Sequence, residues 1–144
     1  MSKKHKVTFQ SDLKSLAGIR LAVSRFLQEN LCPEDDIHAV ELAVHEASSN
    51  IIRHAYPDKT GSTIDLHITL GTEDIIIVLE DQGIPLDQRV YGPDHMDHLK
   101  NTAPSVSPGQ EGGMGLYMIS KLMHRVKATR TGSKNILEMG RTLG

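Results

Sequence analysis

Two strand-like segments face each other across a short turn in Thr63-Ile64-Asp65-Leu66-His67-Ile68-Thr69-Leu70-Gly71-Thr72-Glu73-Asp74-Ile75-Ile76-Ile77-Val78-Leu79-Glu80. The first segment alternates apolar and polar residues, and this period of two is typical of a half-buried strand. The second is a run of β-branched residues from Ile75 to Glu80, which is typical of a central strand. The four-residue turn between them, Gly71 to Asp74, predicts an antiparallel hairpin.

Two helices are predicted ahead of this hairpin. After the capping residues Ser11 and Asp12, apolar residues recur at helical spacing and predict a helix over about 12–30. A longer amphipathic helix, over about 34–55, begins after Pro33 with three acidic residues and stops at Tyr56-Pro57. Alternation at Val7 and Phe9 indicates a short strand before both helices.

The chain after the hairpin begins with a long stretch, 86–112, that has no periodicity and contains several Pro and Gly residues. Such a stretch is typical of a lid, a binding loop or a disordered segment. A helix over about 115–124 and a closing hairpin of 126–130 with 136–143 follow. This order predicts an α+β fold, a two-layer sandwich of a mostly antiparallel mixed sheet with helices on one face. We expect residues 1–144 to form one domain, with a lid at about 86–112.

Composition excludes several functional classes. The 144 residues are 38% hydrophobic and 24% charged, which is the composition of a globular chain. The net charge of −2 argues against a general nucleic-acid-binding protein. The single cysteine, Cys32, allows no intramolecular disulfide, and no apolar run approaches a membrane span or a signal peptide. Together these features predict a cytoplasmic protein.

The first motif that could carry chemistry is Glu46-Ala47-Ser48-Ser49-Asn50 in the long helix. Glu46 and Asn50 are four residues apart and share a helix face, which Arg53 and His54 continue. An Asn carbonyl oxygen suits Mg²⁺, and a neighbouring carboxylate suits a general base. Taken alone, the pattern also fits an ordinary solvated helix face.

The second motif, Asp81-Gln82-Gly83-Ile84-Pro85, ends the β-branched strand. A carboxylate at a strand end can accept a hydrogen bond from a ligand NH₂ group, while a following glycine lets the backbone come close. The alternative is a strand-ending turn, in which Asp, Gly and Pro are all usual.

The third motif, Gly112-Gly113-Met114-Gly115, leads directly into a helix. Glycines at a helix N-terminus expose backbone N–H groups and let a phosphate approach. The motif lacks the Gly-Lys-Ser/Thr of a P-loop and no strand precedes it. Alone, it is equally consistent with a flexible hinge.

Taken together, the order and spacing of the three motifs resemble the Bergerat ATP-binding fold of gyrase, heat-shock chaperones, histidine kinases and mismatch-repair ATPases. Glu46 to Asn50 match its N box, 81–85 match its first glycine box, D-x-G-x-[GP], and Gly113-Met114-Gly115-Leu116 match its second, G-x-G-[LF]. The phrase Glu46-Ala47-x-x-Asn50-Ile51-x-x-His54-Ala55-Tyr56 most resembles bacterial anti-sigma-factor serine kinases of partner-switching systems.

This resemblance implies a role for each matching residue. Asn50 would hold Mg²⁺ between the ATP phosphates, and Glu46 would accept the proton of a substrate serine. Asp81 would bond the adenine amino group, with Gly83 beneath the base. Glycines 113 and 115 would hinge the lid, and N–H groups there would meet the phosphates. Further nucleotide contacts are expected from Arg53, His54, Pro85, Met114, Leu116 and Asn135, the last standing where many relatives have Thr.

The implied function is that of a protein-serine kinase that uses ATP and Mg²⁺. It would phosphorylate an anti-sigma-factor antagonist and sequester a sigma factor. A homodimer is expected, and no direct contact with nucleic acid or membrane is expected.

One departure from the family pattern leaves an alternative function open. Some family kinases carry Arg two residues before G-M-G, where this chain has Glu111. A carboxylate there would not neutralise transition-state charge, so a non-catalytic nucleotide-binding module that only binds its partners is the second reading. The third interpretation is the detached ATPase domain of a histidine kinase. It is disfavoured because the sequence shows no separate dimerisation helix pair that carries a phosphoacceptor His.

Overall fold

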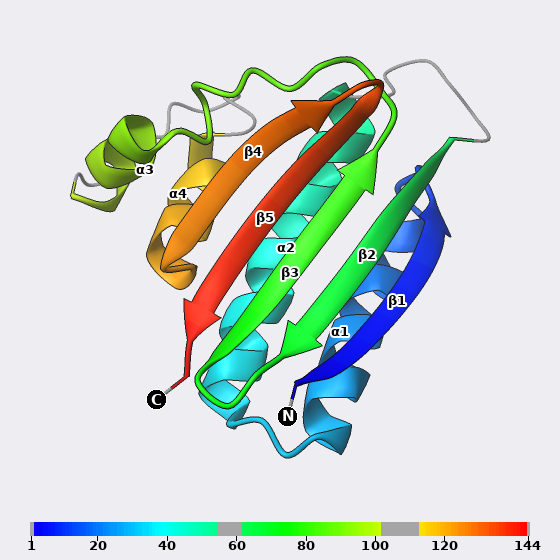
Figure 1. The fold of residues 1–144 in the computed structure, drawn as a ribbon, viewed down its shortest axis with the longest axis vertical. Coiled ribbons are helices and arrows are strands. Elements are labelled where there is room, and N and C mark those ends of the chain that lie inside the picture. The colour runs from blue at the N-terminus through cyan, green and yellow to red at the C-terminus, as the bar shows by residue number, and fades with distance from the viewer. Residues whose placement is uncertain (1, 55–61, 102–112, 144) are drawn as a thin grey trace.

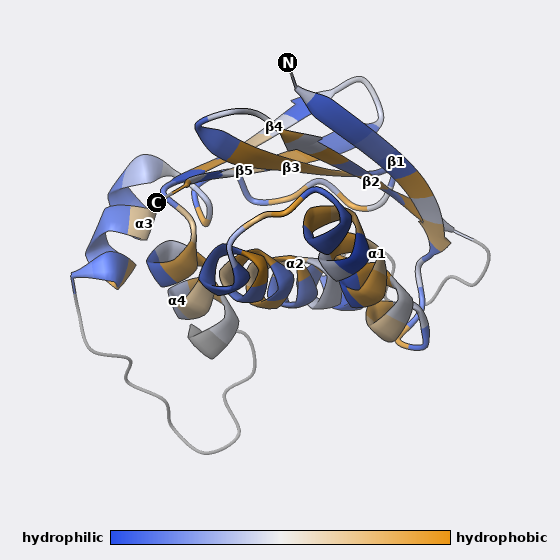
Figure 2. Cartoon of the chain, turned by 90° about the horizontal axis from the view of Figure 1, so that it is seen from below, coloured by the Kyte–Doolittle hydropathy of each residue, from blue (hydrophilic) through white to orange (hydrophobic). Residues whose placement is uncertain are grey.

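A computed structural model describes residues 2–54, 62–101 and 113–143, which form a sheet and a layer of helices on one of its faces (Figures 1 and 2). The elements run β1 (Lys3–Gln10), α1 (Ser15–Glu29), α2 (Glu34–His54), β2 (Thr63–Leu70), β3 (Asp74–Asp81), α3 (Pro93–Lys100), α4 (Gly113–Leu122), β4 (Arg125–Thr131) and β5 (Lys134–Thr142). The predicted α+β class and its two layers are confirmed. No helix within the described ranges is long and apolar enough to cross a membrane.

The five strands lie in the order β1-β2-β3-β5-β4, and all four pairings are antiparallel. The predicted hairpin is β2–β3, in which Leu70 pairs with Ile75. A mixed sheet was expected, in which some strands pair in parallel. For the described strands this expectation is wrong, because all of their pairings are antiparallel. After β3 the chain passes through α3 and α4, enters the β4–β5 hairpin at the sheet edge, and returns antiparallel to β3.

The core is aliphatic and lies between the sheet and the helices. Every second residue of β2 and β3 is buried, which is the pattern that their sequences predict. Helices α1 and α2 close the core from one side with apolar residues at helical spacing, namely Ile19, Val23, Leu27, Val40, Val44, Ala47 and Ile51. Figure 2 shows orange hydrophobic stripes on the facing surfaces of the two layers.

The stretch predicted to lack secondary structure contains a helix, α3. Pro93 occupies its first turn, a position that Pro tolerates because the missing N–H is unpaired there anyway. Only Met96 is buried in this eight-residue helix, so it is too short to give a periodic signal. The remainder of the predicted lid, 102–112, lies outside the described residues, as does residue 55 at the predicted end of the long helix.

An ion pair fixes the start of α2 to the sheet. Arg141 Nε of β5 donates to Asp36 Oδ1 at 2.8 Å, and Arg141 Nη1 donates to the carbonyl oxygen of Leu122 at 2.6 Å. Side-chain exposure is 19% for Arg141 and 7% for Asp36, so the charges are largely shielded from water. One guanidinium therefore joins α2, α4 and β5 at the end of the molecule opposite the tip of β3.

We expect Asp36→Ala to lower the free energy of unfolding by about 3 kcal/mol or more, because it leaves the shielded Arg141 charge without a counterion. Asp74→Ala is the matched control. Asp74 meets Arg125 at 2.9 Å, but the two side chains are 36% and 54% exposed, so the expected loss is about 1 kcal/mol or less. Urea denaturation of both variants checks this, and equal losses would contradict it.

Candidate functional site

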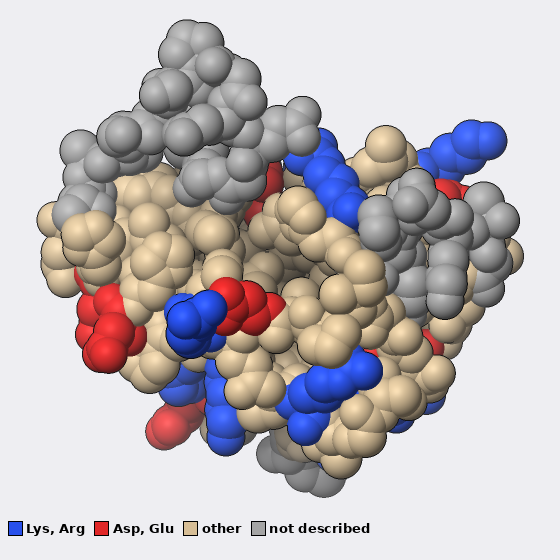
Figure 3. Space-filling model, turned by 90° about the horizontal axis from the view of Figure 1, so that it is seen from above, with Lys and Arg blue, Asp and Glu red and all other residues tan. Residues whose placement is uncertain are grey.

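The three motifs gather at one end of the molecule. β3 ends there with Asp81, α2 reaches it with its last turns, and the β4–β5 turn closes beside them (Figure 1). Figure 3 views this end, where acidic and basic side chains lie around a hollowed surface. Three motifs that are spread over residues 46–115 of the sequence are therefore brought to one end of the molecule.

Asp81 is the most distinctive group of this end, because its carboxylate is only 3% exposed. Its Oδ1 accepts hydrogen bonds from the Gly83 amide at 2.9 Å and from Asn135 Nδ2 at 2.8 Å. Its Oδ2 is buried and has no hydrogen-bond partner among the described residues. A buried carboxylate oxygen without a partner is costly, so this atom is an acceptor that suits the N–H donor of a ligand.

Asn135, at the start of β5, holds Asp81 and the turn after β3 in place. Its Nδ2 donates to Asp81 and also to the carbonyl oxygen of Ile84 at 2.9 Å. Its Oδ1 accepts from Arg130 Nη1 at 2.8 Å and from the Leu86 amide at 3.3 Å. Asn135 is 1% exposed, and both ends of its amide bond to protein. The structure therefore assigns it a positioning role on Asp81, while its predicted contact with a nucleotide stays a prediction.

Glu46 and Asn50 lie half-buried on α2, one turn apart. Gly115 of α4 approaches this face so closely that an added Cβ would lie 2.7 Å from Glu46 Oε2. Only glycine permits that approach without moving the carboxylate. The first and third motifs are thus in contact, which their separation in the sequence could not establish.

Tyr91 is a site residue that the sequence analysis missed. It lies in the connection between β3 and α3 and is 4% exposed. Burial raises the pKa of Tyr91, the Asn50 hydrogen bond lowers it, and the nearby Asp81 charge raises it further. The sequence offered only a weak signal for this residue, because Tyr91 is one of three tyrosines in a chain with few aromatic residues and belongs to none of the three motifs.

The remaining predicted residues are distributed around this centre. Arg53 and His54 are exposed in the last turn of α2, and Gly83 and Pro85 lie in the turn after β3. Gly113 and Met114 open α4, and Leu116 packs against the core beside them. The structure brings all of them to the same end, and their individual contacts with a nucleotide stay predictions.

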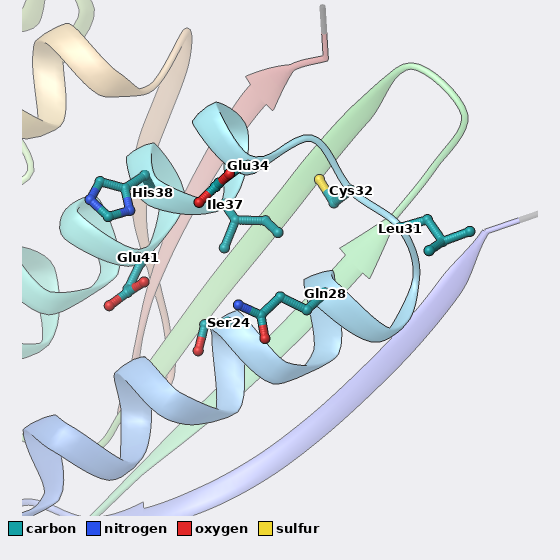
Figure 4. Close-up of a pocket in the computed structure, with 8 residues that line it drawn as sticks. All are labelled: Ser24, Gln28, Leu31, Cys32, Glu34, Ile37, His38 and Glu41. Carbon is teal, nitrogen blue, oxygen red and sulfur yellow. The ribbon is translucent and has the colours of Figure 1, made fainter.

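A separate cavity of about 580 Å³ lies between α1 and α2 (Figure 4). Glu34 and Glu41 place carboxylates in its wall, which disfavours an anionic phosphate ligand. Burial and the charge of Asp36 raise the pKa of the Cys32 thiol in the same wall, so this cysteine is a poor nucleophile at neutral pH. The three motifs therefore define the better candidate site.

The histidine kinase-like ATPase domain model matches residues 9–141, so the chain belongs to that family. Within it, the chain is 31% identical over 109 residues to the serine-protein kinase RsbW of Halalkalibacterium halodurans and 33% identical over 114 residues to that of Bacillus licheniformis. Each alignment covers 76% of this chain, and they cover 65% and 67% of the two relatives. This chain thus spans about two thirds of the length of these relatives. They confirm the predicted resemblance to serine kinases.

Two solved structures share the fold. One contains the RsbU and RsbW domains of a Mycobacterium tuberculosis protein and matches with a TM-score of 0.68, 15% identity, 98% coverage of this chain and 32% of that chain. The other is the SiaB–SiaC complex of Pseudomonas aeruginosa, with a TM-score of 0.63, 13% identity, 95% coverage of this chain and 88% of that chain. At these identities, the likeness supports the arrangement of sheet and helices alone.

Asn135→Ala should lower the free energy of unfolding by about 1–3 kcal/mol, because buried partners lose their hydrogen bonds. It should also speed hydrogen exchange at the Leu86 amide, which loses its acceptor. Asn101→Ala is the control, since that side chain is exposed and donates to the Asp97 carbonyl oxygen at 2.9 Å. The change should stay within about 0.5 kcal/mol. Unchanged exchange at Leu86 would refute the positioning role.

Proposed function

We propose that this protein is an ATP-dependent protein-serine kinase of a partner-switching system. The buried Oδ2 of Asp81 carries the proposal, because it is an acceptor that lies among the three motifs without a described partner. The adenine amino group is a donor of matching chemistry. The relatives named serine-protein kinase support the reaction class.

Nucleotide selection would depend on the turn after β3. Since Asn135 and the Gly83 amide occupy Asp81 Oδ1, only Oδ2 is available to accept from the base. The glycine leaves room for the base to lie against the backbone. Backbone N–H groups at the start of α4, from Gly113 onward, would bind phosphate oxygens at the positive end of the helix dipole. We further propose nucleotide contacts from Arg53, His54, Pro85, Met114 and Leu116.

Asn50 and Glu46 would provide the chemistry on α2. The Asn50 carbonyl oxygen is a ligand type that Mg²⁺ accepts beside phosphate and water, and the bound ion would neutralise charge on the transferred phosphoryl group. Glu46 would take the proton from the attacking serine hydroxyl as general base. Its half-buried carboxylate, packed against Gly115, is held on the face that the phosphates would reach.

The proposed partners follow the same system. The substrate would be a serine of an anti-sigma-factor antagonist, and the unphosphorylated antagonist would compete with a sigma factor held by this protein. We propose a homodimer, a single domain over 1–144 and a lid over about 86–112. Because the sigma factor acts in transcription, the proposal places the protein in the cytoplasm.

The second candidate is a nucleotide-binding module without catalysis, favoured by Glu111 in the position where some family kinases have Arg. Glu111 lies outside the described residues. The two candidates share the nucleotide site and differ only in phosphoryl transfer, so one binding measurement and one transfer measurement separate them.

Asp81→Asn should weaken binding of Mg²⁺-ATP by about ten- to hundredfold without unfolding the protein. An amide oxygen can keep the bonds made by Oδ1, and the NH₂ group then replaces the free acceptor Oδ2 with a donor. Calorimetric titration of both proteins checks this. Equal affinities would remove Asp81 from the base pocket, and no binding by folded wild type would refute the nucleotide site.

Glu46→Gln should slow transfer from γ-labelled ATP to the purified antagonist protein encoded nearby by about a hundredfold or more, at nearly unchanged ATP affinity. Glu41→Gln is the matched control on the same helix, because Glu41 pairs with Arg20 at 2.9 Å away from the three motifs. Full transfer by Glu46→Gln would exclude a general base at this position. ATP binding by wild type without any transfer would favour the non-catalytic module.

A further inference from the structure

A row of polar side chains crosses three neighbouring strands at the end of β3. In the antiparallel register, Asp81 of β3 pairs with Asn135 of β5, and Asn135 pairs with Arg130 of β4. The three strands lie side by side in Figure 1. The next row toward the middle of the sheet is apolar and consists of Leu79, Leu137 and Ala128. The polar row therefore lies where the core ends and the candidate site begins.

Arg130 is the unusual member of this row, because it is a cation on the side of the sheet that the helices cover. Side chains alternate along a strand, and Val126 and Ala128, two and four residues earlier, pack against the core. Arg130 Nη1 donates to Asn135 Oδ1 at 2.8 Å and to the carbonyl oxygen of Gly83 at 3.3 Å. One nitrogen can serve both acceptors, because it has two N–H groups. The guanidinium thus joins β5 to the turn after β3.

The contact with Arg130 decides which way the Asn135 amide faces, because a guanidinium can only donate. Since the amide oxygen accepts from Arg130, the NH₂ group is left for Asp81 Oδ1 at 2.8 Å and for the carbonyl oxygen of Ile84 at 2.9 Å. The Gly83 amide donates to the same carboxylate oxygen at 2.9 Å. Two donors on Oδ1 leave the buried Oδ2, which has no described partner, as the acceptor for a ligand.

We propose that Arg130 is a positioning residue through which the site selects a 6-aminopurine over a 6-oxopurine. It acts through Asn135, whose NH₂ group it turns toward Asp81. The inference rests on the proposed function, because it concerns how that nucleotide site reads the base. The amino group of a 6-aminopurine donates to Oδ2, whereas the oxygen of a 6-oxopurine would face it as a second acceptor. A buried acceptor that is left without a donor is costly, and this cost produces the selectivity.

Arg130→Met removes the guanidinium and keeps an unbranched stem. We expect ATP affinity to fall about three- to tenfold, the effect of one lost polar contact, and the affinity for inosine triphosphate to change less than about twofold. Both nucleotides carry the same triphosphate, so the loss of a positive charge affects them equally and cancels in the ratio of their dissociation constants. Calorimetric titration of both nucleotides with Mg²⁺ present gives this ratio, and thermal unfolding verifies that the variant is folded.

Arg125→Met is the matched control, because it removes the same charge from the other end of the same strand. Arg125 Nη2 donates to Asp74 Oδ2 at 2.9 Å, and its side chain is 54% exposed. This variant should leave the ratio of the two dissociation constants unchanged. In an Asn135→Ala background that is verified to be folded, Arg130→Met should also leave the ratio unchanged, because the guanidinium acts through the amide.

Three results would overturn the inference while leaving ATP binding intact. An unchanged ratio in Arg130→Met, whether both affinities fall together or neither falls, would mean that the guanidinium does not act on base selection. A further fall of the ratio in the Asn135→Ala background would mean that Arg130 acts without Asn135. Equal affinities of wild type for the two nucleotides would mean that the site does not read the amino group. If folded wild type binds neither nucleotide, the proposed function fails and the role of Arg130 fails with it.

Discussion

The hydrogen bond from Asn135 to Asp81 is the contact on which the candidate site depends. It joins the last residue of β3 to the second residue of β5, at the pair where their antiparallel register ends. Because it satisfies only one carboxylate oxygen, it fixes the direction of the other. The amide oxygen of the same Asn135 accepts from the Leu86 amide, so Asn135 also fixes the chain that leaves the sheet. One amide therefore organises the acceptor Asp81 and the turn after β3.

Helix α2 supplies the opposite wall, and its placement depends on contacts at its two ends. The Asp36–Arg141 pair secures its first turn to β5, where the side chains are shielded and a lone charge would be costly. Farther along the helix, Gly115 lets α4 approach Glu46. The start of α2 and the face that bears Glu46 are thus both held by other elements. Rigid elements of this kind position reactive groups better than loops do.

Much of this fold follows from local patterns. The period-two alternation of β2 and the β-branched run of β3 predict the hairpin and its buried face, because burial on one side of a pleated strand dictates every second residue. Helical spacing predicts α1 and α2 to within a few residues. The short α3 escapes prediction, because eight residues with one buried side chain give no period, and the fully antiparallel sheet depends on a long-range return of the chain that no local pattern encodes.

By itself, the sequence determined the two-layer class, the strand and helix faces and the three motifs, since each depends on residue type and spacing along a few turns or one strand. The tertiary structure decided what these motifs touch. The resemblance predicts Asn135 as a nucleotide contact, and only the structure shows that its amide bonds to the protein at both ends. Tyr91 belongs to no motif, yet it is buried in the core cluster between β3 and α3. Such contacts arise only when packing brings distant segments together, because hydrogen bonds and close approaches depend on distance in space and not on separation along the chain.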